Sequence, residues 1–295
     1  MRFVTFKKNN NPRAGLEILN KGIIDLNKVD KNLPTDLNNI IKNYPTIQDQ
    51  IQNINNIQNI HYSLNEVDLL SPIPTPVRDI ICVGKNYAEH AKEVQKSSFS
   101  TLSEKIQVPK EPIIFNKATT SVIGPNAKIE LINDRTNTTD YEGELGVIIG
   151  KRTKNVNYKN VNDAIFGYTI INDVTARKLQ NNHKQWFIGK SPDTFCPMGP
   201  SIVTKDEIKI IEDIKIQTFV NGEVRQTGTI KDMIFDIPTI IETLSKSMTL
   251  VEGDIIATGT PSGVGIGFDP PKFLKSGDKV KILVDQIGTL ENEVI

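Results

Sequence analysis

The sequence is short of cysteine and has no excess of charge of either sign. Two of its 295 residues are cysteines, Cys82 and Cys196, which is too few for the disulfide framework of a secreted protein of this length. Its 35 Lys and Arg are balanced by 35 Asp and Glu, so no net positive field attracts it to nucleic acid or to an anionic membrane. We therefore expect a protein of a reducing compartment with neither of these partners.

Long apolar segments are also missing. No run approaches the roughly 20 apolar residues that a membrane-spanning helix needs, and the start of the chain, Met1 to Phe6, lacks the apolar stretch of a signal peptide. The basic residues near the start are soon followed by acidic ones, unlike an organelle presequence. These features predict a soluble, intracellular protein, cytoplasmic in preference to mitochondrial.

The composition changes near Ser71. Residues 32–59 are rich in Asn, a poor helix and strand former, yet five isoleucines from Ile47 to Ile60 recur at near-helical spacing. The segment is therefore either an amphipathic helix or an Asn-rich surface stretch with no specific task. The prolines between residues 72 and 76 predict an extended linker. We expect a small N-terminal α+β domain at residues 1–75 and a larger domain at residues 76–295.

Beyond the linker, short β-rich runs alternate with Gly and Pro, and helical patterns are few. Strands are predicted at residues 80–83, 112–115, 145–149, 166–171, 215–220, 254–258 and 279–284, and helices at residues 87–94, 174–181 and 237–246. This mixture indicates an α+β fold with a mixed, barrel-like sheet. The lack of regular strand–helix alternation argues against a Rossmann fold.

The sharpest chemical feature is the run Asp140 to Glu144, which leads into an apolar segment. Side chains two apart on a strand share a face, so Glu142 and Glu144 repel each other unless a cation lies between them. Asp173 ends a second apolar run. Three carboxylates with no His or Cys nearby favour Mg²⁺, Mn²⁺ or Ca²⁺ over zinc or copper. Taken alone, the Glu pair also fits a solvated acidic face, and Asp173 fits an ordinary helix N-cap.

Several further motifs follow one another in a fixed order. They are Val83 to Glu93, Asn172 to Gln180, Gly189 to Pro200 and Gly259 to Gly265. Together with the Glu-x-Glu segment, they resemble the fumarylacetoacetate hydrolase (FAH) family from about Ile80 to the C-terminus. Within that family the chain looks most like the eukaryotic fumarylacetoacetate hydrolase domain-containing protein 2 group, which also carries an N-terminal extension. The resemblance implies an FAH-type catalytic domain behind a small N-terminal domain.

The resemblance also implies a role for each matching position, and it implies a homodimer. The implied ligands of a divalent metal, Mg²⁺ first with Mn²⁺ or Ca²⁺ as alternatives, are Glu142, Glu144 and Asp173. The implied catalytic residues are His90, Glu93 and Lys190. The implied substrate contacts are Arg177, Gln180 and Thr260.

Residue spacing agrees with these roles. His90 and Glu93 are three apart, so on a helix they are neighbours, and a carboxylate beside an imidazole orients it and raises its basicity. If a helix opens directly after Asp173, that carboxylate shares a helix face with Arg177 and Gln180. Outside the motifs, the ordinary alternative for such charged and His side chains is simple surface exposure. Cys196 is expected to be a buried structural thiol.

These residues predict an enzyme acting on a small 2-oxo acid with a β-carbonyl or β-carboxylate group. The metal would stabilise an enolate, while His90 supported by Glu93 would activate water and Lys190 would stabilise oxyanion charge. We expect hydrolysis of a C–C bond, as in an acylpyruvate. The alternatives are oxaloacetate tautomerisation or decarboxylation at the same site, or a catalytically silent metal-binding scaffold. Pro192, where the family usually has Phe, leaves the choice of substrate open.

Overall fold

The computed structural model describes residues 1–96 and 109–295. Its helices are α1 (Leu26–Val29), α2 (Leu37–Ile57), α3 (Ala88–Lys96), α4 (Arg177–Asn182), α5 (Phe187–Lys190) and α6 (Ile237–Ser247). The strands of the first half are β1 (Arg2–Lys8), β2 (Asn11–Ile18), β3 (Gly22–Asp25), β4 (Asp68–Leu69), β5 (Ile80–Gly84), β6 (Ile113–Lys117), β7 (Val122–Ile123), β8 (Lys128–Ile129), β9 (Thr139–Asp140) and β10 (Gly143–Ile149). Those of the second half are β11 (Ile165–Asn172), β12 (Thr175–Ala176), β13 (Cys196–Thr204), β14 (Lys215–Val220), β15 (Glu223–Thr229), β16 (Ile255–Ala257), β17 (Lys279–Val284) and β18 (Gly288–Val294).

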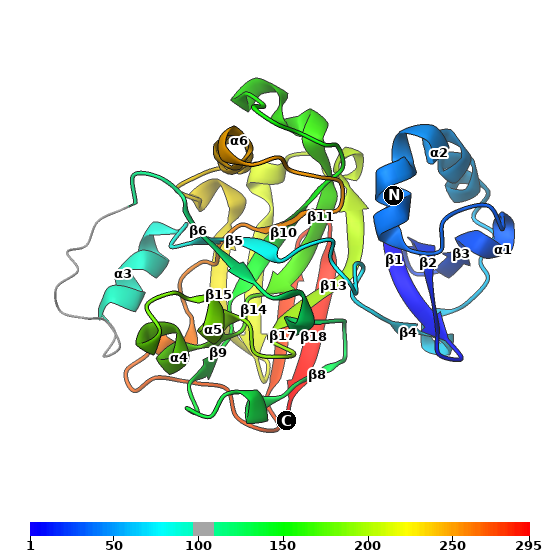
Figure 1. The fold of residues 1–295 in the computed structure, drawn as a ribbon. Coiled ribbons are helices and arrows are strands. Elements are labelled where there is room, and N and C mark those ends of the chain that lie inside the picture. Colours follow the sequence, from blue (N-terminus) through cyan, green and yellow to red (C-terminus); the bar gives the residue numbers. More distant parts are fainter. Residues whose placement is uncertain (97–108) are drawn as a thin grey trace.

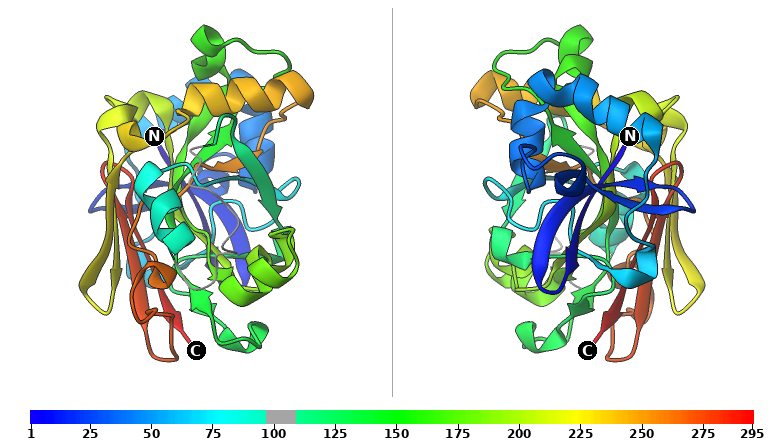
Figure 2. Two further views of the ribbon diagram at one scale, coloured as in Figure 1. Left: turned by 90° about the vertical axis from the view of Figure 1, so that its left-hand side faces the viewer. Right: turned by 90° about the vertical axis from the view of Figure 1, so that its right-hand side faces the viewer.

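Two open sheets make up most of the molecule (Figure 1). The larger runs in the order β3-β2-β1-β13-β11-β10-β16-β5-β6, and the smaller in the order β15-β14-β17-β18-β8. Both orders are linear, so within the described residues neither sheet closes into a barrel. Figure 2 shows the smaller sheet as a separate layer beside the larger one. The α+β class with a mixed sheet is confirmed.

The two sheets bury a common apolar core. Leu145 of β10 and Ile170 of β11 belong to the same buried cluster as Ile216 of β14 and Ile282 of β17. β10 and β11 are buried along their whole length, which explains why their sequences are continuous apolar runs and do not alternate. These two strands form the rigid platform on which the polar residues at their ends are held.

The N-terminal segment extends the larger sheet. β1 pairs with β2 on one side and with β13 on the other, and Phe3 of β1 packs on Phe166 with ring centroids 5.4 Å apart. The Asn-rich segment forms the long helix α2, which begins where the Asp36 side chain accepts a hydrogen bond from the Asn39 N–H. Of the two alternatives, the amphipathic helix is therefore confirmed. The domain boundary near residue 75 stays a prediction.

The predicted strands and helices are found near their expected positions, with one error. Residues 174–181 were expected to be helical, but Thr175–Ala176 form β12, which pairs with β9, and α4 begins only at Arg177. Asp173 therefore lies neither on this helix nor at its N-cap, which is Ala176. Tertiary strand pairing outweighs local helical periodicity here.

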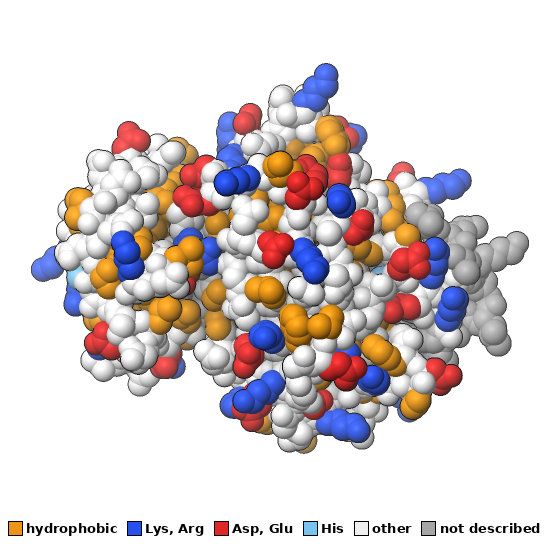
Figure 3. Space-filling view, turned by 180° about the vertical axis from the view of Figure 1, so that it is seen from behind, with side chains coloured by type: hydrophobic (Ala, Val, Ile, Leu, Met, Phe, Trp, Pro, Cys, Tyr) orange, Lys and Arg blue, Asp and Glu red, His pale blue; other side chains and the backbone are white. Residues whose placement is uncertain are grey.

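The surface is of mixed character. On the face shown in Figure 3, acidic and basic side chains are interspersed, as the balanced composition suggests. None of the helices in the described part of the chain is long and apolar enough to cross a membrane.

Candidate active site

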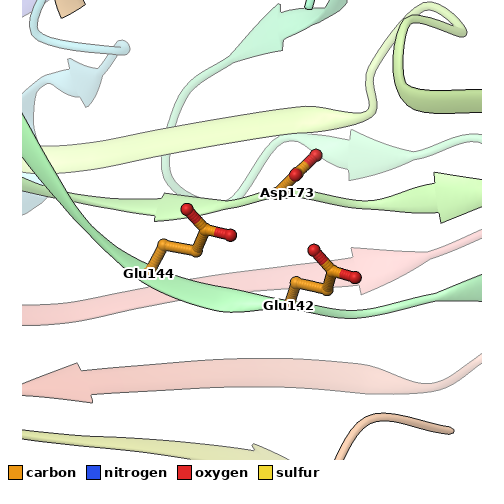
Figure 4. A group of neighbouring side chains, drawn as sticks. All are labelled: Glu142, Glu144 and Asp173. Carbon is orange, nitrogen blue, oxygen red and sulfur yellow. The ribbon is translucent and has the colours of Figure 1, made fainter. Parts of the chain in front are cut away.

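The three predicted metal ligands come together where β10 starts and β11 ends. Because the two strands are antiparallel, with Gly143 opposite Asn172, the start of one lies beside the end of the other. Glu142 directly precedes β10 and Asp173 directly follows β11, and the Asp173 N–H donates to the Glu142 carbonyl at 2.8 Å. Figure 4 shows Glu142 and Glu144 pointing to the same side, toward Asp173. One carboxylate oxygen from each residue lies within 4.8 Å of the others, and all three residues are buried.

Buried cations surround this carboxylate cluster. The Lys190 ammonium lies 2.7 Å from Oε2 of Glu142 and 2.6 Å from Oδ2 of Asp173. The ammonium of Lys117, a fully buried residue, lies 2.7 Å from the other carboxylate oxygen of Asp173. Burial opposes the charged form of Lys190, but Asp173 and Glu142 outweigh it and raise the pKa of Lys190 above its usual value. Lys190 is therefore held as a cation within the cluster.

The two glutamates differ in their electrostatic environment. Burial acts to raise the pKa of Glu142, but Lys190 and Arg177 outweigh it and hold this pKa well below its usual value. Burial raises the pKa of Glu144, and the negative charges of Asp173 and Glu142 raise it further. The Gly259 N–H donates to Glu144 at 2.8 Å. Of the two glutamates, Glu144 is therefore the one whose ionised form an added positive charge would stabilise more.

These properties fit a hard divalent cation. The donor set consists of oxygen atoms alone, which Mg²⁺, Mn²⁺ and Ca²⁺ prefer. A cation among the three carboxylates would also counter the like-charge repulsion that raises the pKa of Glu144. Glu142, Glu144 and Asp173 are therefore the residues that would hold such an ion.

His90 and Glu93 form a hydrogen-bonded pair on α3. Nδ1 of His90 lies 2.9 Å from Oε1 of Glu93, and the other oxygen of Glu93 accepts the Gly263 N–H at 2.9 Å. A carboxylate accepts hydrogen bonds, so in a neutral imidazole this pairing favours the tautomer with the proton on Nδ1 and the lone pair on Nε2. This is the tautomer that a general base requires.

One narrow cavity of about 40 Å³ brings most of the predicted residues together. Its walls include seven of them, namely His90, Glu142, Glu144, Arg177, Gln180, Lys190 and Thr260. Asp173 joins through the carboxylate cluster, and Glu93 lies behind His90, where it contacts the imidazole and the loop at Gly263. All nine predicted residues therefore belong to one site.

The predicted substrate-binding residues are themselves held by the protein. Arg177 places Nε 2.8 Å from Oδ2 of Asp140 and Nη1 2.6 Å from Oε1 of Glu142. Its Nη2 is buried and has no hydrogen-bond partner among the described residues. The Thr260 hydroxyl accepts from Gln226 at 2.7 Å and donates to the Gly143 carbonyl at 2.9 Å. Arg177 therefore brings to the cavity wall a side chain with one buried, unpaired donor, Nη2.

Several site residues were not predicted from the sequence. Lys117, Asp140 and Gln226 are fully buried and bonded to the predicted residues. Trp186, the single tryptophan of the chain, lines the cavity and packs edge-on against Phe115 at 5.1 Å between ring centroids. For Lys117 a signal existed, because this lysine ends β6 two residues after an apolar run. For the others, only the fold reveals the contact.

The match to a known family agrees with this geometry. Residues 79–295 match the family described as fumarylacetoacetate (FAA) hydrolase C-terminal. The chain therefore belongs to the fumarylacetoacetate hydrolase family, as its motifs indicated, and is an enzyme of that family.

Two relatives are particularly similar. Oxaloacetate tautomerase YisK of Bacillus subtilis (strain 168) is 53% identical over 233 residues, which are 79% of this chain and 75% of the relative. Oxaloacetate tautomerase fahd2, mitochondrial, of Xenopus laevis is 39% identical over 301 residues, which cover 100% of this chain and 90% of the relative. The second match spans the N-terminal segment too, and it agrees with the predicted likeness to the domain-containing protein 2 group.

Two solved structures share the fold over the whole chain. The fumarylacetoacetate hydrolase EaFAH of Exiguobacterium antarcticum has a TM-score of 0.80 and 38% identity, with 100% of this chain and 99% of that chain covered. Maleylpyruvate hydrolase of Sphingobium sp. SYK-6, solved with manganese(II) and pyruvate, has a TM-score of 0.79, 29% identity and the same coverage. Together with the buried acidic cluster, the latter structure suggests a divalent metal in this chain as well.

Proposed function

We propose that this protein is a divalent-metal-dependent oxaloacetate tautomerase, which interconverts the keto and enol forms of oxaloacetate. The observation that carries this proposal is the meeting, around one cavity, of three carboxylates suited to a hard cation and an imidazole oriented as a base. The two oxaloacetate tautomerases that are 53% and 39% identical to the chain support the choice of substrate.

The reaction moves one proton and consumes no water. In the keto-to-enol direction a C3–H bond of oxaloacetate breaks, its electron pair forms the C2=C3 double bond, and the C2 oxygen gains a proton. Negative charge develops on the C2 oxygen as the C3 proton leaves. A catalyst therefore needs a base near C3 and positive charge near the C2 oxygen.

A divalent cation held by Glu142, Glu144 and Asp173 would supply Lewis-acid stabilisation of a substrate oxygen. Mg²⁺ is our first choice, with Mn²⁺ and Ca²⁺ as alternatives, because all three prefer carboxylate oxygens.

The side chains of the cavity supply the remaining functions. Nε2 of His90 accepts the C3 proton, since Nδ1 is engaged with Glu93. Lys190, held as a cation by Asp173 and Glu142, contributes positive charge for the C2 oxygen. Nη2 of Arg177, whose hydrogen-bonding capacity is unused among the described residues, binds a carboxylate of the substrate.

Hydrolysis of a C–C bond in an acylpyruvate is the second candidate. The maleylpyruvate hydrolase with bound manganese(II) and pyruvate, 29% identical to this chain, favours it. In that reaction His90 takes a proton from a water molecule whose oxygen attacks the acyl carbonyl. The C–C bond then breaks, its electron pair goes to the enolate of pyruvate, which gains a proton at C3, and the acyl group leaves as a carboxylate. Decarboxylation of oxaloacetate is a third use of the same residues.

Separate readouts distinguish the three reactions. Oxaloacetate is added in its enol form, loss of the enol absorbance is followed, and pyruvate is assayed in the same samples. Faster enol loss without pyruvate identifies a tautomerase, and pyruvate from oxaloacetate identifies a decarboxylase. Pyruvate from acetylpyruvate or maleylpyruvate identifies a C–C hydrolase. Each assay is repeated after chelation and with Mg²⁺, Mn²⁺ or Ca²⁺ restored. Enol loss that no cation accelerates would refute the proposed tautomerase.

A further inference from the structure

Asp140 is a buried carboxylate that lies outside the metal-ligand cluster and the cavity wall. Its Oδ1 accepts the Tyr141 N–H at 2.9 Å and the Gly265 N–H at 2.6 Å. Its Oδ2 accepts the Ile266 N–H at 2.9 Å and Nε of Arg177 at 2.8 Å. Both oxygens therefore face two N–H donors each, and the residue has no exposed surface.

Arg177 connects Asp140 to the carboxylate cluster. The guanidinium of Arg177 spans two carboxylates, with Nε on Asp140 and Nη1 on Glu142. Because the guanidinium is planar, fixing these two nitrogens also fixes the direction of Nη2. Asp140 therefore orients the donor that the proposed function assigns to the substrate carboxylate.

The loop from Gly263 to Gly267 connects Asp140 to the His90–Glu93 pair. It donates to Asp140 through Gly265 and Ile266, and to Glu93 through Gly263. The loop is thus held between two carboxylates. Glu93 in turn orients His90.

The glycines of the loop permit this close approach. A Cβ on Gly265 would lie 2.4 Å from the Lys272 carbonyl oxygen and 2.6 Å from Oδ1 of Asp140, and a Cβ on Gly267 would lie 2.5 Å from Oε2 of Glu93. A side chain at either position would push the loop away from its carboxylate. Glycine at these two positions therefore allows the loop to contact both Asp140 and Glu93.

We propose that Asp140 is a positioning residue that holds the substrate-binding arginine and the His90–Glu93 pair in one fixed arrangement. This role rests on the proposed function, because it assigns Asp140 an effect on catalysis through Arg177 and Glu93. Asp140 belongs neither to the carboxylate cluster nor to the cavity wall. If its role were only to stabilise the fold, its loss would lower the melting temperature and leave the folded enzyme fully active.

Asp140→Asn tests the role with almost no change in shape. Each oxygen of Asp140 faces two N–H donors, so the new amide nitrogen meets donors in either orientation and the hydrogen bonds on that side are lost. We expect kcat of the folded variant to fall by about 10- to 100-fold, the usual effect of losing a partner that orients an active-site residue. KM for oxaloacetate should rise as well, because Arg177 loses its orientation.

Asp254→Asn is the matched control. Asp254 is also buried and also accepts from an arginine and a backbone amide, namely Arg78 and Val251, but it does not line the cavity. We expect this variant to lose thermal stability and to keep kcat. If both variants keep kcat, or if both lose it in proportion to their loss of folded protein, Asp140 is only structural.

The double variant Asp140→Asn with Glu93→Gln tests whether Asp140 acts through the His90–Glu93 pair. In kcat, the double variant should be little worse than the more damaged single variant, since both changes disturb the His90–Glu93 pair. The rise in KM, which arises through Arg177, should remain. Losses that multiply would overturn the positioning role. If Asp140→Asn does not fold, Asp140→Glu keeps the charge but displaces the carboxylate from its four N–H donors, and it should show the same non-additivity with Glu93→Gln.

A readout without turnover separates this proposal from the proposed function. The chain has three histidines, so the NMR signals of their rings can be assigned by single substitutions. Asp140→Asn should shift the ring signals of His90 and leave those of His61 and His183 unchanged. Unchanged His90 signals would refute the positioning role whatever the substrate is. A wild-type enzyme that is inactive toward oxaloacetate, with shifted His90 signals in the variant, would refute the tautomerase alone.

Discussion

Glu142 and Glu144 share a strand face but have different partners. Glu142 contacts the cationic groups of Lys190 and Arg177, whereas Glu144 accepts the Gly259 N–H and faces two negative carboxylates. A divalent cation would therefore change the free energy of Glu144 more than that of Glu142. We therefore expect a substitution of Glu144 to change both the stability of the metal-free protein and the stability gained when metal binds.

Glu144→Gln should separate stability from metal binding. The substitution removes the buried like-charge repulsion, so the melting temperature in chelator should equal or exceed that of wild type. The same change removes one ligand charge, so the metal-induced rise in melting temperature should disappear. In wild type that rise corresponds to about 2.7 kcal/mol at a free metal concentration 100 times Kd. Thermal scans and calorimetry with Mn²⁺ measure both effects. Wild-type Mn²⁺ affinity in the variant would exclude Glu144 as a ligand.

His90→Ala should separate metal binding from chemistry. His90 is proposed to move protons and not to hold the cation, so the Mn²⁺ affinity should be retained. Turnover should fall on the order of 10² to 10⁴, the usual contribution of a general acid–base group. His183→Ala is the control, since His183 is exposed at the end of α4 and its loss should leave turnover unchanged. An active His90→Ala variant would remove the imidazole from the mechanism.

At the scale of elements, the site lies where the antiparallel pair β10 and β11 brings together the start of one strand and the end of the other. The sequence predicted both strands and their terminal carboxylates, because continuous apolar runs and a Glu-x-Glu spacing are local signals. It misplaced the start of α4, since β12 forms only by pairing with β9, far away in the chain. Asp140 and Gln226 were missed for the same reason. Their partners are loop amides and side chains that only the tertiary fold brings near.

The start of α5 forms the aromatic wall of the cavity. Trp186 packs on Phe115 and lies so close to Gly84 that a Cβ there would be 2.3 Å from the indole ring. Trp186 and Phe115 belong to the wall of the cavity, whereas Pro192 does not line it. The contact between Gly84 and the indole leaves no free space on that side of the cavity.

Trp186→Phe should therefore relax the selection by substrate size. The smaller ring leaves more room beside Gly84, so kcat/KM for acylpyruvates with long acyl chains should rise relative to that for oxaloacetate. A small change in the size of a hydrophobic pocket is worth about 1 to 3 kcal/mol. The ratio of the two kcat/KM values should therefore change by about 10- to 200-fold. Steady-state kinetics on oxaloacetate and on a series of acylpyruvates of increasing length measures it, with loss of the enol absorbance as the readout for every substrate. An unchanged preference would show that another wall limits substrate size.

At the scale of the whole molecule, the two cysteines report on global unfolding. Both thiols are fully buried. Burial raises the pKa of Cys196 to about 12 and that of Cys82 well above its usual value, so at neutral pH both remain protonated, and the thiolate is the reactive form. Neither should react with a thiol reagent in the native protein, and both should react in denaturant. Fast labelling of native protein would contradict this burial.

The N-terminal segment and the rest of the chain share one sheet. β1 pairs with the edge of β13, and the chain's first amine lies 2.9 Å from Glu207 and donates to the hydroxyl of Thr204. Phe3 packs on Phe166 within a cluster that also holds Met198. Removing residues 1–71 would expose these side chains of the larger part and free an edge strand for aggregation. Burying one apolar side chain contributes about 1.5 to 3 kcal/mol. Exposing several of them would therefore remove a large fraction of a typical free energy of unfolding.

All proposed ligands and catalytic residues nevertheless lie beyond residue 72, and the β10–β11 platform keeps its contacts to β16 and the smaller sheet. We therefore expect residues 72–295 to fold with a markedly lower melting temperature and to bind Mn²⁺ with nearly the affinity of the full chain. Since the lost contacts are apolar and specific, residues 1–71 added as a separate chain should raise that melting temperature by reoccupying the edge of β13. Calorimetry and thermal scans on the fragment, alone and mixed, measure both effects. A fragment that folds under no condition, even with its partner present, would show that the boundary near residue 75 does not divide two domains.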